Sequence, residues 1–158
     1  MRIRTITLPV AAMAITGLGL VAYAQPKPVS SRTGVAVVYK TASCGCCSLW
    51  VEHLKKNGFQ VVVNDVSAAQ VRTVSQSAGL SEDNTSCHTA RIGGYIVEGH
   101  VPAADIQRML KEKPAIAGIA APGMPMGSPG MEQGGRAETY NVIAFTKDGK
   151  TTAFAKHP

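Results

Sequence analysis

The sequence predicts an α/β fold, in which a mixed sheet with flanking helices is followed by an extension rich in Met, Gly and Pro that ends in a hairpin. Three observations predict it. Short β-branched runs alternate with helical patterns from residue 35 to residue 113. A group of cysteines, "SCGCC", joins the first strand to the first helix. Beyond Lys113 the chain reads "PAIAGIAAPGMPMGSPGMEQGG", which has no usable periodicity and predicts a long wrapping loop.

The N-terminus predicts a secretory signal peptide. Arg2 and Arg4 precede an apolar run over residues 8–21, and a small-x-small cleavage signal ends at Ala24. A retained anchor is the alternative, but this run is shorter than the ~20 residues that span a bilayer. We therefore expect cleavage after Ala24, a periplasmic location and no membrane span in the mature chain. The predicted division is a signal peptide at 1–24, a linker at 25–34 and one metal-binding domain at 35–158.

The charge of the chain predicts no nucleic-acid partner. Its formal net charge is +6, and loss of Arg2 and Arg4 with the signal peptide would leave +4. The basic residues are scattered, without a basic run and with few aromatic residues between them. Nucleic-acid binding needs a basic patch or stripe, so we interpret this charge as a contribution to solubility.

The first half of the domain predicts two strands with a helix between them. The β-branched runs are residues 35–39 and 59–66. Between them, "SLWVEHLKKNGF" has the spacing of an amphipathic helix, with Trp50, Val51 and Leu54 on its apolar face. An Asn-Gly pair provides the stop signal at the end of this helix.

The second half predicts a helix, a hairpin, another helix and a final hairpin. Residues 67–78 have a helical pattern, and "TARIGG" and "YIVEGH" are two strands joined at Gly93-Gly94. The stretch "VPAADIQRMLKEK" predicts a helix with Pro102 near its first position. The stretch "YNVIAFTKDGKTTAFAKH" predicts a terminal hairpin that turns at residues 147–150.

The order β-α-β-α-β-β-α, with a C-x-x-C pair at a helix start, is that of a thioredoxin-like fold. The pair is Cys44 and Cys47. Unpaired N–H groups and the positive end of the helix dipole favour thiolate there, the form that attacks disulfides and binds metals. Cys46 adds a third thiol, which would invite the wrong disulfide in a simple dithiol exchanger. Adjacent cysteines lack the C-x₂₋₄-C spacing of a closed zinc site, whereas several thiolates suit soft Cu(I).

Cys87 is the fourth candidate ligand. In a thioredoxin-like fold the loop before the third strand lies against the N-terminus of the first helix, and "SCHTA" falls at that place. A small buried core residue is the alternative interpretation. Neighbours in extended chain point to opposite sides, so we expect Cys87 to face the other thiols. His88 is left as either a ligand or a hydrogen-bonded neighbour of one. Four free thiols in an oxidising compartment would allow three disulfide pairings.

The remaining histidines and methionines carry weaker signals. His100 lies at a strand-to-helix corner, where a role in the site and a structural cap both remain open. Met124 and Met126 lie among Gly and Pro rather than on an apolar helix face, so they either contact copper as thioethers or belong to a segment that covers the site. We expect His53 on the surface and His157 free at the tail.

Four motifs, "SCGCC…W", "SCHTA", "GGYIVEGHVP" and "PGMPMGSPGME", together resemble the CopG-like periplasmic copper-resistance family, long catalogued as a domain of unknown function. The resemblance extends from about Val35 to Phe145, although "GLSEDNT" departs from the Pro-containing version of that loop. It implies a thioredoxin-like fold, export, a polynuclear Cu–thiolate cluster and copper oxidation-state chemistry. The metal ligands that it implies are Cys44, Cys46, Cys47 and Cys87.

Two functional hypotheses follow. The first is an exported protein that holds more than one Cu(I) ion for copper resistance or homeostasis, with periplasmic copper carriers or efflux components as partners and Cu(I)/Cu(II) conversion left open. The alternative is a thiol–disulfide oxidoreductase that uses Cys44 and Cys47. Cys46, Cys87 and the methionines favour copper. The pattern favours a metal-binding protein over an enzyme, so we assign no catalytic residue and no cofactor besides copper.

Overall fold

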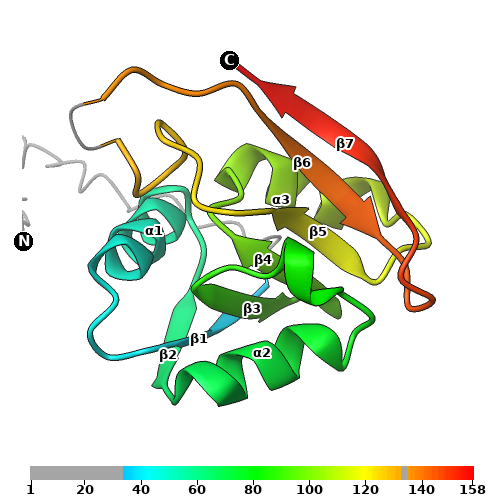
Figure 1. The fold of residues 1–158 in the computed structure, drawn as a ribbon, viewed down its shortest axis with the longest axis horizontal. Helices are drawn as coiled ribbons and strands as arrows, with labels where there is room; N and C mark the ends of the chain where they lie inside the picture. Colours follow the sequence, from blue (N-terminus) through cyan, green and yellow to red (C-terminus); the bar gives the residue numbers. More distant parts are fainter. Residues whose placement is uncertain (1–33, 133–134) are drawn as a thin grey trace, which may run out of the picture.

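The computed structural model of the chain describes residues 34–132 and 135–158 (Figure 1). The predicted signal peptide and residues 25–33 of the predicted linker lie outside the described residues. The elements are β1 (Ala36–Lys40), α1 (Gly45–Lys56), β2 (Val61–Asp65), α2 (Ala68–Gln76), the 3₁₀ turn η1 (Glu82–Asn84), β3 (His88–Ile92), β4 (Tyr95–Gly99), α3 (Ala103–Glu112), β5 (Gly118–Ala121), β6 (Tyr140–Phe145) and β7 (Thr151–His157).

The strands form one mixed sheet in the order β2-β1-β3-β4-β5-β6-β7. The pairs β1–β2 and β4–β5 are parallel, and the other neighbours are antiparallel. The helices α1 and α3 pack against one face, and α2 lies along the other, below β3 in Figure 1. The predicted α/β class with a mixed sheet is confirmed, as is the element order from β1 to α3.

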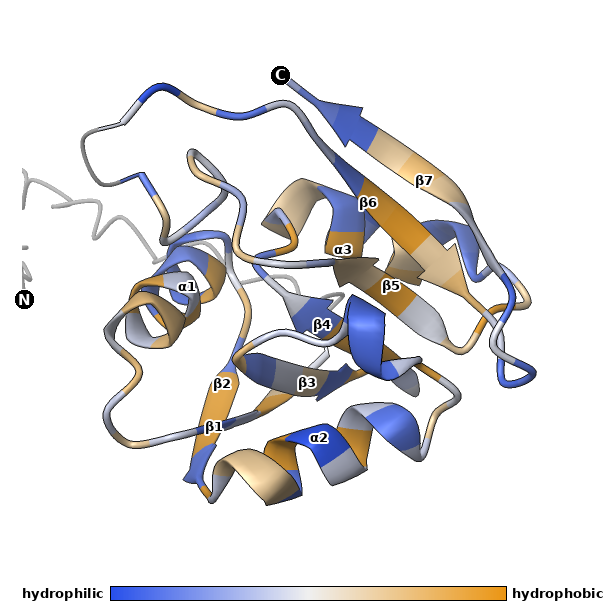
Figure 2. Ribbon diagram, in the orientation of Figure 1, coloured by the Kyte–Doolittle hydropathy of each residue, from blue (hydrophilic) through white to orange (hydrophobic). Residues whose placement is uncertain are grey.

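The main core lies between the sheet and the pair α1 and α3. Trp50 and Leu54 are fully buried there against Val38, together with Ile106 and Met109 of α3. The Trp50 indole Nε1–H donates to the Val101 carbonyl at 2.8 Å. In Figure 2 the apolar positions of α1 and the central strands appear in orange. The predicted apolar face of α1 is therefore confirmed, and this core fixes the position of the helix whose first turn carries the cysteines.

Both predicted hairpins are confirmed. The β3–β4 turn consists of Gly93 and Gly94, with φ angles of 58° and 90°. A side chain strongly disfavours positive φ at both central residues, and for that reason Gly-Gly is typical of this turn. At the C-terminus β6 pairs antiparallel with β7, with a bulge between Val142 and Ile143.

One expectation about the elements was wrong. The long loop expected after Lys113 contains the strand β5, which pairs with β4 and β6. All four β5 residues are buried, because a strand inside a sheet packs on both faces and has no polar alternation. Gly118 is required there, since a Cβ atom would come close to the Ile96 carbonyl. The first helix begins at Gly45 with Cys44 as its cap, so the C-x-x-C pair lies at the helix start as expected.

Within the ranges that the structure describes, no helix has the length and apolar character needed to cross a bilayer.

Candidate metal centre

The first turn of α1 presents three cysteines beside the end of β1. Cys44 is the N-cap residue, with extended backbone, and its Sγ accepts a hydrogen bond from the Cys47 N–H at 3.3 Å. Sulfur here replaces the oxygen of an ordinary cap and satisfies one of the unpaired N–H groups of the helix start. Cys46 follows at a partly exposed position, whereas the Cys47 side chain is fully buried. The cap therefore holds Cys44 and Cys47 together at the helix start.

Strand pairing brings Cys87 to the same place. β3 runs antiparallel to β1, and its first residue, His88, pairs with Lys40, the last residue of β1. Cys87 therefore lies just beyond the end of β1, where the chain turns into α1. Its Sγ is 3.2 Å from the Cys47 Sγ and 4.0 Å from the Cys46 Sγ. A separation of about forty residues in sequence is thus closed by the register of two strands.

The four cysteines form one cluster, and their Sγ atoms all lie within 4.8 Å of one another. Cys44 and Cys47 form a disulfide, with their Cα atoms 5.3 Å apart, and Cys46 and Cys87 are free thiols. The Cys46 Sγ lies 3.6 Å from the Cys44 Sγ. The structure thus brings together all four sulfur atoms singled out in the sequence, and their role as ligands is argued below as a proposal.

Two histidines adjoin the fourth cysteine. The Cys87 Sγ is 3.6 Å from His88 Nδ1 and 3.7 Å from His100 Nε2, so these three residues form a second group of ligand atoms. The Nδ1 atom of His100 lies 2.8 Å from the Pro129 carbonyl, which can only accept, so we assign the proton to Nδ1. The Nε2 lone pair of His100 then faces the sulfur. Of the two interpretations left open for His100, the structure favours a place at the site.

Burial keeps both histidines neutral. His88 is fully buried between the Trp50 and His100 rings, with ring centroids 4.5 Å and 4.8 Å away. Burial, with nearby His100 and Lys40, lowers the pKa of His88 to about 3. Burial also lowers the pKa of His100. A metal ligand must be a neutral imidazole, so neither ring has to lose a proton before it binds an ion near pH 7.

The fourth thiol is held in its protonated form. Burial and the neighbouring Cys46 raise the pKa of the Cys87 thiol to about 12. The low-polarity surroundings penalise a thiolate that has no cation beside it. A soft metal ion would supply that cation and displace the proton, so metal uptake at Cys87 must release protons.

A buried acid that the sequence analysis did not identify fixes the backbone before Cys87. Oε1 of Glu98 accepts the Ser86 N–H, and among the described residues its Oε2 has no hydrogen-bond partner. Burial raises the pKa of Glu98 to about 7. The signal was present in the sequence, because Glu98 is the single charged residue of the buried strand "YIVEG". It positions the loop that carries the fourth thiol.

Glu98→Gln should change the pH dependence of stability. The folded protein retains the Glu98 proton between the ordinary pKa of 4.5 and about 7, whereas the unfolded chain releases it. Rising pH therefore favours unfolding in this window, by at most about 1.4 kcal/mol per pH unit. Gln does not titrate, so the variant should gain stability relative to the parent from pH 5 to pH 7. Urea unfolding with chelator present and the disulfide intact measures this difference. Because His88 and His100 are common to both proteins, a constant difference would contradict the prediction.

The Met- and Pro-rich segment covers the start of α1. In Figure 1 the chain between β5 and β6 passes beside α1. Gly130 lies directly on the helix, where a Cβ atom would be 2.8 Å from the Cys46 carbonyl oxygen and from the Trp50 nitrogen. The Ser86 hydroxyl also donates to the Gly123 carbonyl at 3.0 Å, which places the backbone next to Met124 beside the Cys87 loop. The segment is thus held at both sides of the cysteine cluster.

The two methionines differ in their surroundings. The Met124 side chain is 50% exposed, and Met126 is partly buried, with its Cε atom near Gly135. Met126 is also held by its backbone, because its N–H donates to Glu138 Oε2 at 3.1 Å and its carbonyl accepts the Glu138 N–H at 2.9 Å. These contacts give the segment a covering role, and a thioether contact with copper stays a prediction.

Gly130→Ala should open this cover. The added methyl group would force the segment away from α1, so alkylation of the Cys46 thiol should become several-fold faster. Gly123→Ala is the matched control, because Gly123 shares the positive φ but has no atom within 4 Å of its ideal Cβ position. Alkylation rates resolved by peptide mass mapping measure the effect. Equal rates in the two variants would show that backbone strain, and not the contact with α1, sets access to the thiol.

Two histidines make contacts that the sequence did not predict. His53 is partly exposed at the surface, and its Nε2 also accepts the Ala103 N–H at 3.0 Å and so satisfies the start of α3. His157 is not free at the tail, because its Nε2 lies 2.6 Å from Asp105 Oδ2 and its ring stacks on Tyr140. Both roles depend on contacts about fifty residues apart, which a local sequence pattern does not reveal.

Comparison with known proteins identifies the family. The family model described as "Protein of unknown function, DUF411" matches residues 84–131. No curated protein matches the chain. Two solved structures, titled copper resistance protein copG, Form 1 and Form 2, are similar to it. They share 41% and 43% sequence identity with TM-scores of 0.72, covering 80% and 79% of this chain and 98% of theirs. With this similarity over nearly the whole of both solved chains, and with the cysteine cluster in place, the protein belongs to the CopG family of copper resistance proteins.

Proposed function

We propose that the protein is an exported copper-binding protein that holds more than one Cu(I) ion at the cluster of four cysteines, for copper resistance or homeostasis. The observation that supports it is the convergence of four Sγ atoms within 4.8 Å of one another, with two imidazole nitrogens beside Cys87. Thiolate sulfur is the donor that selects Cu(I).

The number and arrangement of donors favour more than one ion. Four sulfur atoms and two ring nitrogens exceed the four positions of one tetrahedral ion. Cys87 belongs to both ligand groups, and a thiolate shared in this way bridges two ions. Copper is the cargo here, received from or passed to periplasmic copper carriers or efflux components. The proposed route to that compartment depends on the N-terminal sequence alone.

The disulfide adds a redox partner for the cargo. Reduction of Cys44–Cys47 to two thiols takes up two electrons and two protons, and oxidation of two Cu(I) ions to Cu(II) supplies the two electrons. The reverse step returns both. The cluster could therefore interconvert copper oxidation states without another cofactor. The same disulfide is the observation that favours the second candidate function, a thiol–disulfide oxidoreductase that uses Cys44 and Cys47.

Copper titration of the reduced protein tests the proposal. Against a competing Cu(I) chelator, uptake should saturate above one equivalent, because six donors serve more than one ion. Cys46→Ser should lower that number yet leave the Cys44–Cys47 pair able to cycle. Ser48→Ala is a suitable control, since its exposed hydroxyl donates to the Cys44 carbonyl in the same turn and carries no thiol. A sharp end point at one copper, or unchanged uptake in Cys46→Ser, would favour the oxidoreductase.

A further inference from the structure

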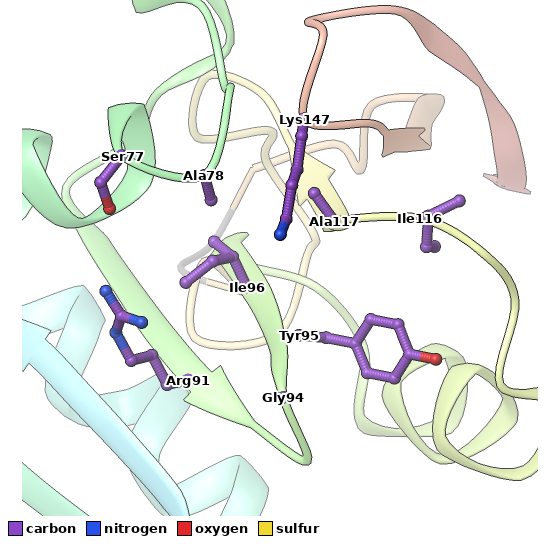
Figure 3. Close-up of a pocket in the computed structure, with 9 residues that line it drawn as sticks. All are labelled: Ser77, Ala78, Arg91, Gly94, Tyr95, Ile96, Ile116, Ala117 and Lys147. Carbon is purple, nitrogen blue, oxygen red and sulfur yellow. The ribbon is translucent and has the colours of Figure 1, made fainter.

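A pocket lies at the opposite end of the sheet from the cysteines. β3 begins at His88 beside the cluster, and Arg91 is three residues further, about 10 Å along the strand. The pocket has a volume of about 320 Å³. This is within the range of about 300–1,000 Å³ typical of small-molecule sites. Its principal lining residues are Ser77, Arg91, Ile96, Ile116, Ala117 and Lys147 (Figure 3).

Two cations of the pocket have no anionic partner. Within residues 34–132 and 135–158, neither Arg91 nor Lys147 forms an ion pair or a side-chain hydrogen bond, and the pocket lining contains no Asp or Glu. The acid closest in sequence, Asp148, is paired instead with Lys150 at 2.7 Å. In Figure 3 the Lys147 ammonium points into the space beside Ile96, and the Arg91 guanidinium lies on the other side of Ile96. The pocket therefore has an uncompensated positive charge.

The walls of the pocket are fixed by backbone contacts. Gly79, with φ +94°, brings the end of α2 against the β6–β7 turn so closely that a Cβ atom would be 2.5 Å from the Lys147 carbonyl oxygen. On the other side the Tyr95 hydroxyl donates to the Pro114 carbonyl at 3.1 Å, and the Ala117 N–H donates to the Phe145 carbonyl at 2.8 Å. These contacts hold the walls of the pocket together and do not involve the charged groups of Arg91 and Lys147.

One wall of the pocket is apolar. Ile96 is buried in the smaller core cluster, and Ile116 and Ala117 form the adjoining wall. A second cavity of about 220 Å³ shares Ile116, Ala117 and Lys147, so Lys147 borders both cavities. An inorganic anion would use the charges but leave this apolar surface uncovered.

We propose that this pocket binds a small organic carboxylate, whose carboxylate group is attracted by the charges of Arg91 and Lys147 and whose apolar part covers the partly exposed Ile116 and Ala117. Guanidinium is the cation that best matches carboxylate geometry, and the apolar part would gain by leaving water. The pocket shares no residue with the cysteine cluster, so carboxylate binding would be a second function that does not depend on copper binding.

An NMR titration of the isotope-labelled full chain tests the proposal, with butyrate, acetate and inorganic phosphate as probes at constant ionic strength. Butyrate should give saturable shifts at amides of the pocket lining. It should bind about tenfold more tightly than acetate, because two further methylene groups leave water. Phosphate binding as tight as that of butyrate would overturn the organic part of the proposal, and shifts that rise linearly without saturation would overturn the site.

Charge-matched variants locate the binding. Arg91→Gln and Lys147→Gln should each weaken butyrate at least several-fold. Their controls are Arg72→Gln on the exposed side of α2 and Lys156→Gln at an exposed position of β7, which should bind as the parent does. Copper uptake should be unchanged in all four variants. Carboxylate binding and copper binding are therefore tested separately. Equal weakening by the controls would mean that overall charge, and not the pocket, attracts the anion.

Discussion

Cys87→Ser is expected to lower copper affinity by at least about 100-fold. Loss of even an outer partner of a metal ligand costs about 10–100-fold. Cys87 is the one residue common to both ligand groups, within 4.0 Å of Cys46, Cys47, His88 and His100. Its loss would separate the sulfur group from the imidazole pair. Titration of the reduced variant against a Cu(I) chelator measures the change.

The control for this variant addresses folding. Ser is close to Cys in size, and Cys87 is not part of the main core around Trp50 and Val38. The thermal unfolding midpoint of the metal-free variant should therefore stay near that of the parent. Ser86→Ala, which alters the neighbouring hydroxyl but no thiol, should retain copper. If a folded Cys87→Ser protein binds the parent's number of ions, Cys87 lies outside the copper site.

Reduction of the Cys44–Cys47 disulfide is expected to control copper loading. The oxidised protein offers two free thiols, Cys46 and Cys87, whereas the reduced protein offers all four cysteines of the chain. A disulfide sulfur has no thiolate charge to give a metal ion. Uptake by the oxidised protein should therefore fall to half or less of the uptake after reduction. Parallel thiol counts and Cu(I) titrations, before and after a non-thiol reductant, measure both quantities on one sample.

The reverse experiment completes this test. Once copper is bound, its thiolates should be protected, so oxidised glutathione should close the disulfide slowly in the loaded protein and quickly in the metal-free protein. Peptide mass mapping after alkylation identifies which cysteines are protected. Equal copper uptake in the oxidised and reduced forms would place the disulfide outside the copper site and favour a separate exchange function.

Local patterns were sufficient for the parts of the fold that local rules determine. The spacing of Trp50 and Leu54 predicted the buried face of α1, and Gly93-Gly94 predicted a turn that needs positive φ at both positions. The strand β5 was missed because a short strand buried on both faces has no alternation to detect. The assignment of the first part of the domain to a thioredoxin-like fold stays a prediction.

The sequence was sufficient to predict which cysteines form the candidate site, but not the protonation and hydrogen bonding of the groups around it. The motifs singled out the four cysteines and placed Cys87 opposite the helix start, where the register of β1 and β3 does bring it. The raised pKa of Cys87 was not predictable, because it depends on burial by segments distant in sequence. The hydrogen bond from Ser86 to Glu98 and the capping contact of His53 also arise only when the chain is folded.

The position of the covering segment determines which sequence changes near the site the fold can tolerate. Residues 122–139 connect two strands that pair with each other, and the Ala120–Ile143 pair fixes both ends independently of what lies between. Loop-closure entropy grows slowly with length, by about 0.6 kcal/mol for each doubling. Insertions, deletions and new donor side chains in this connection should therefore cost the sheet little. The cysteines depend on a helix cap and a strand register, whereas in the covering segment it is the close contact of Gly130 with α1, and not the sheet, that limits which residues can be exchanged.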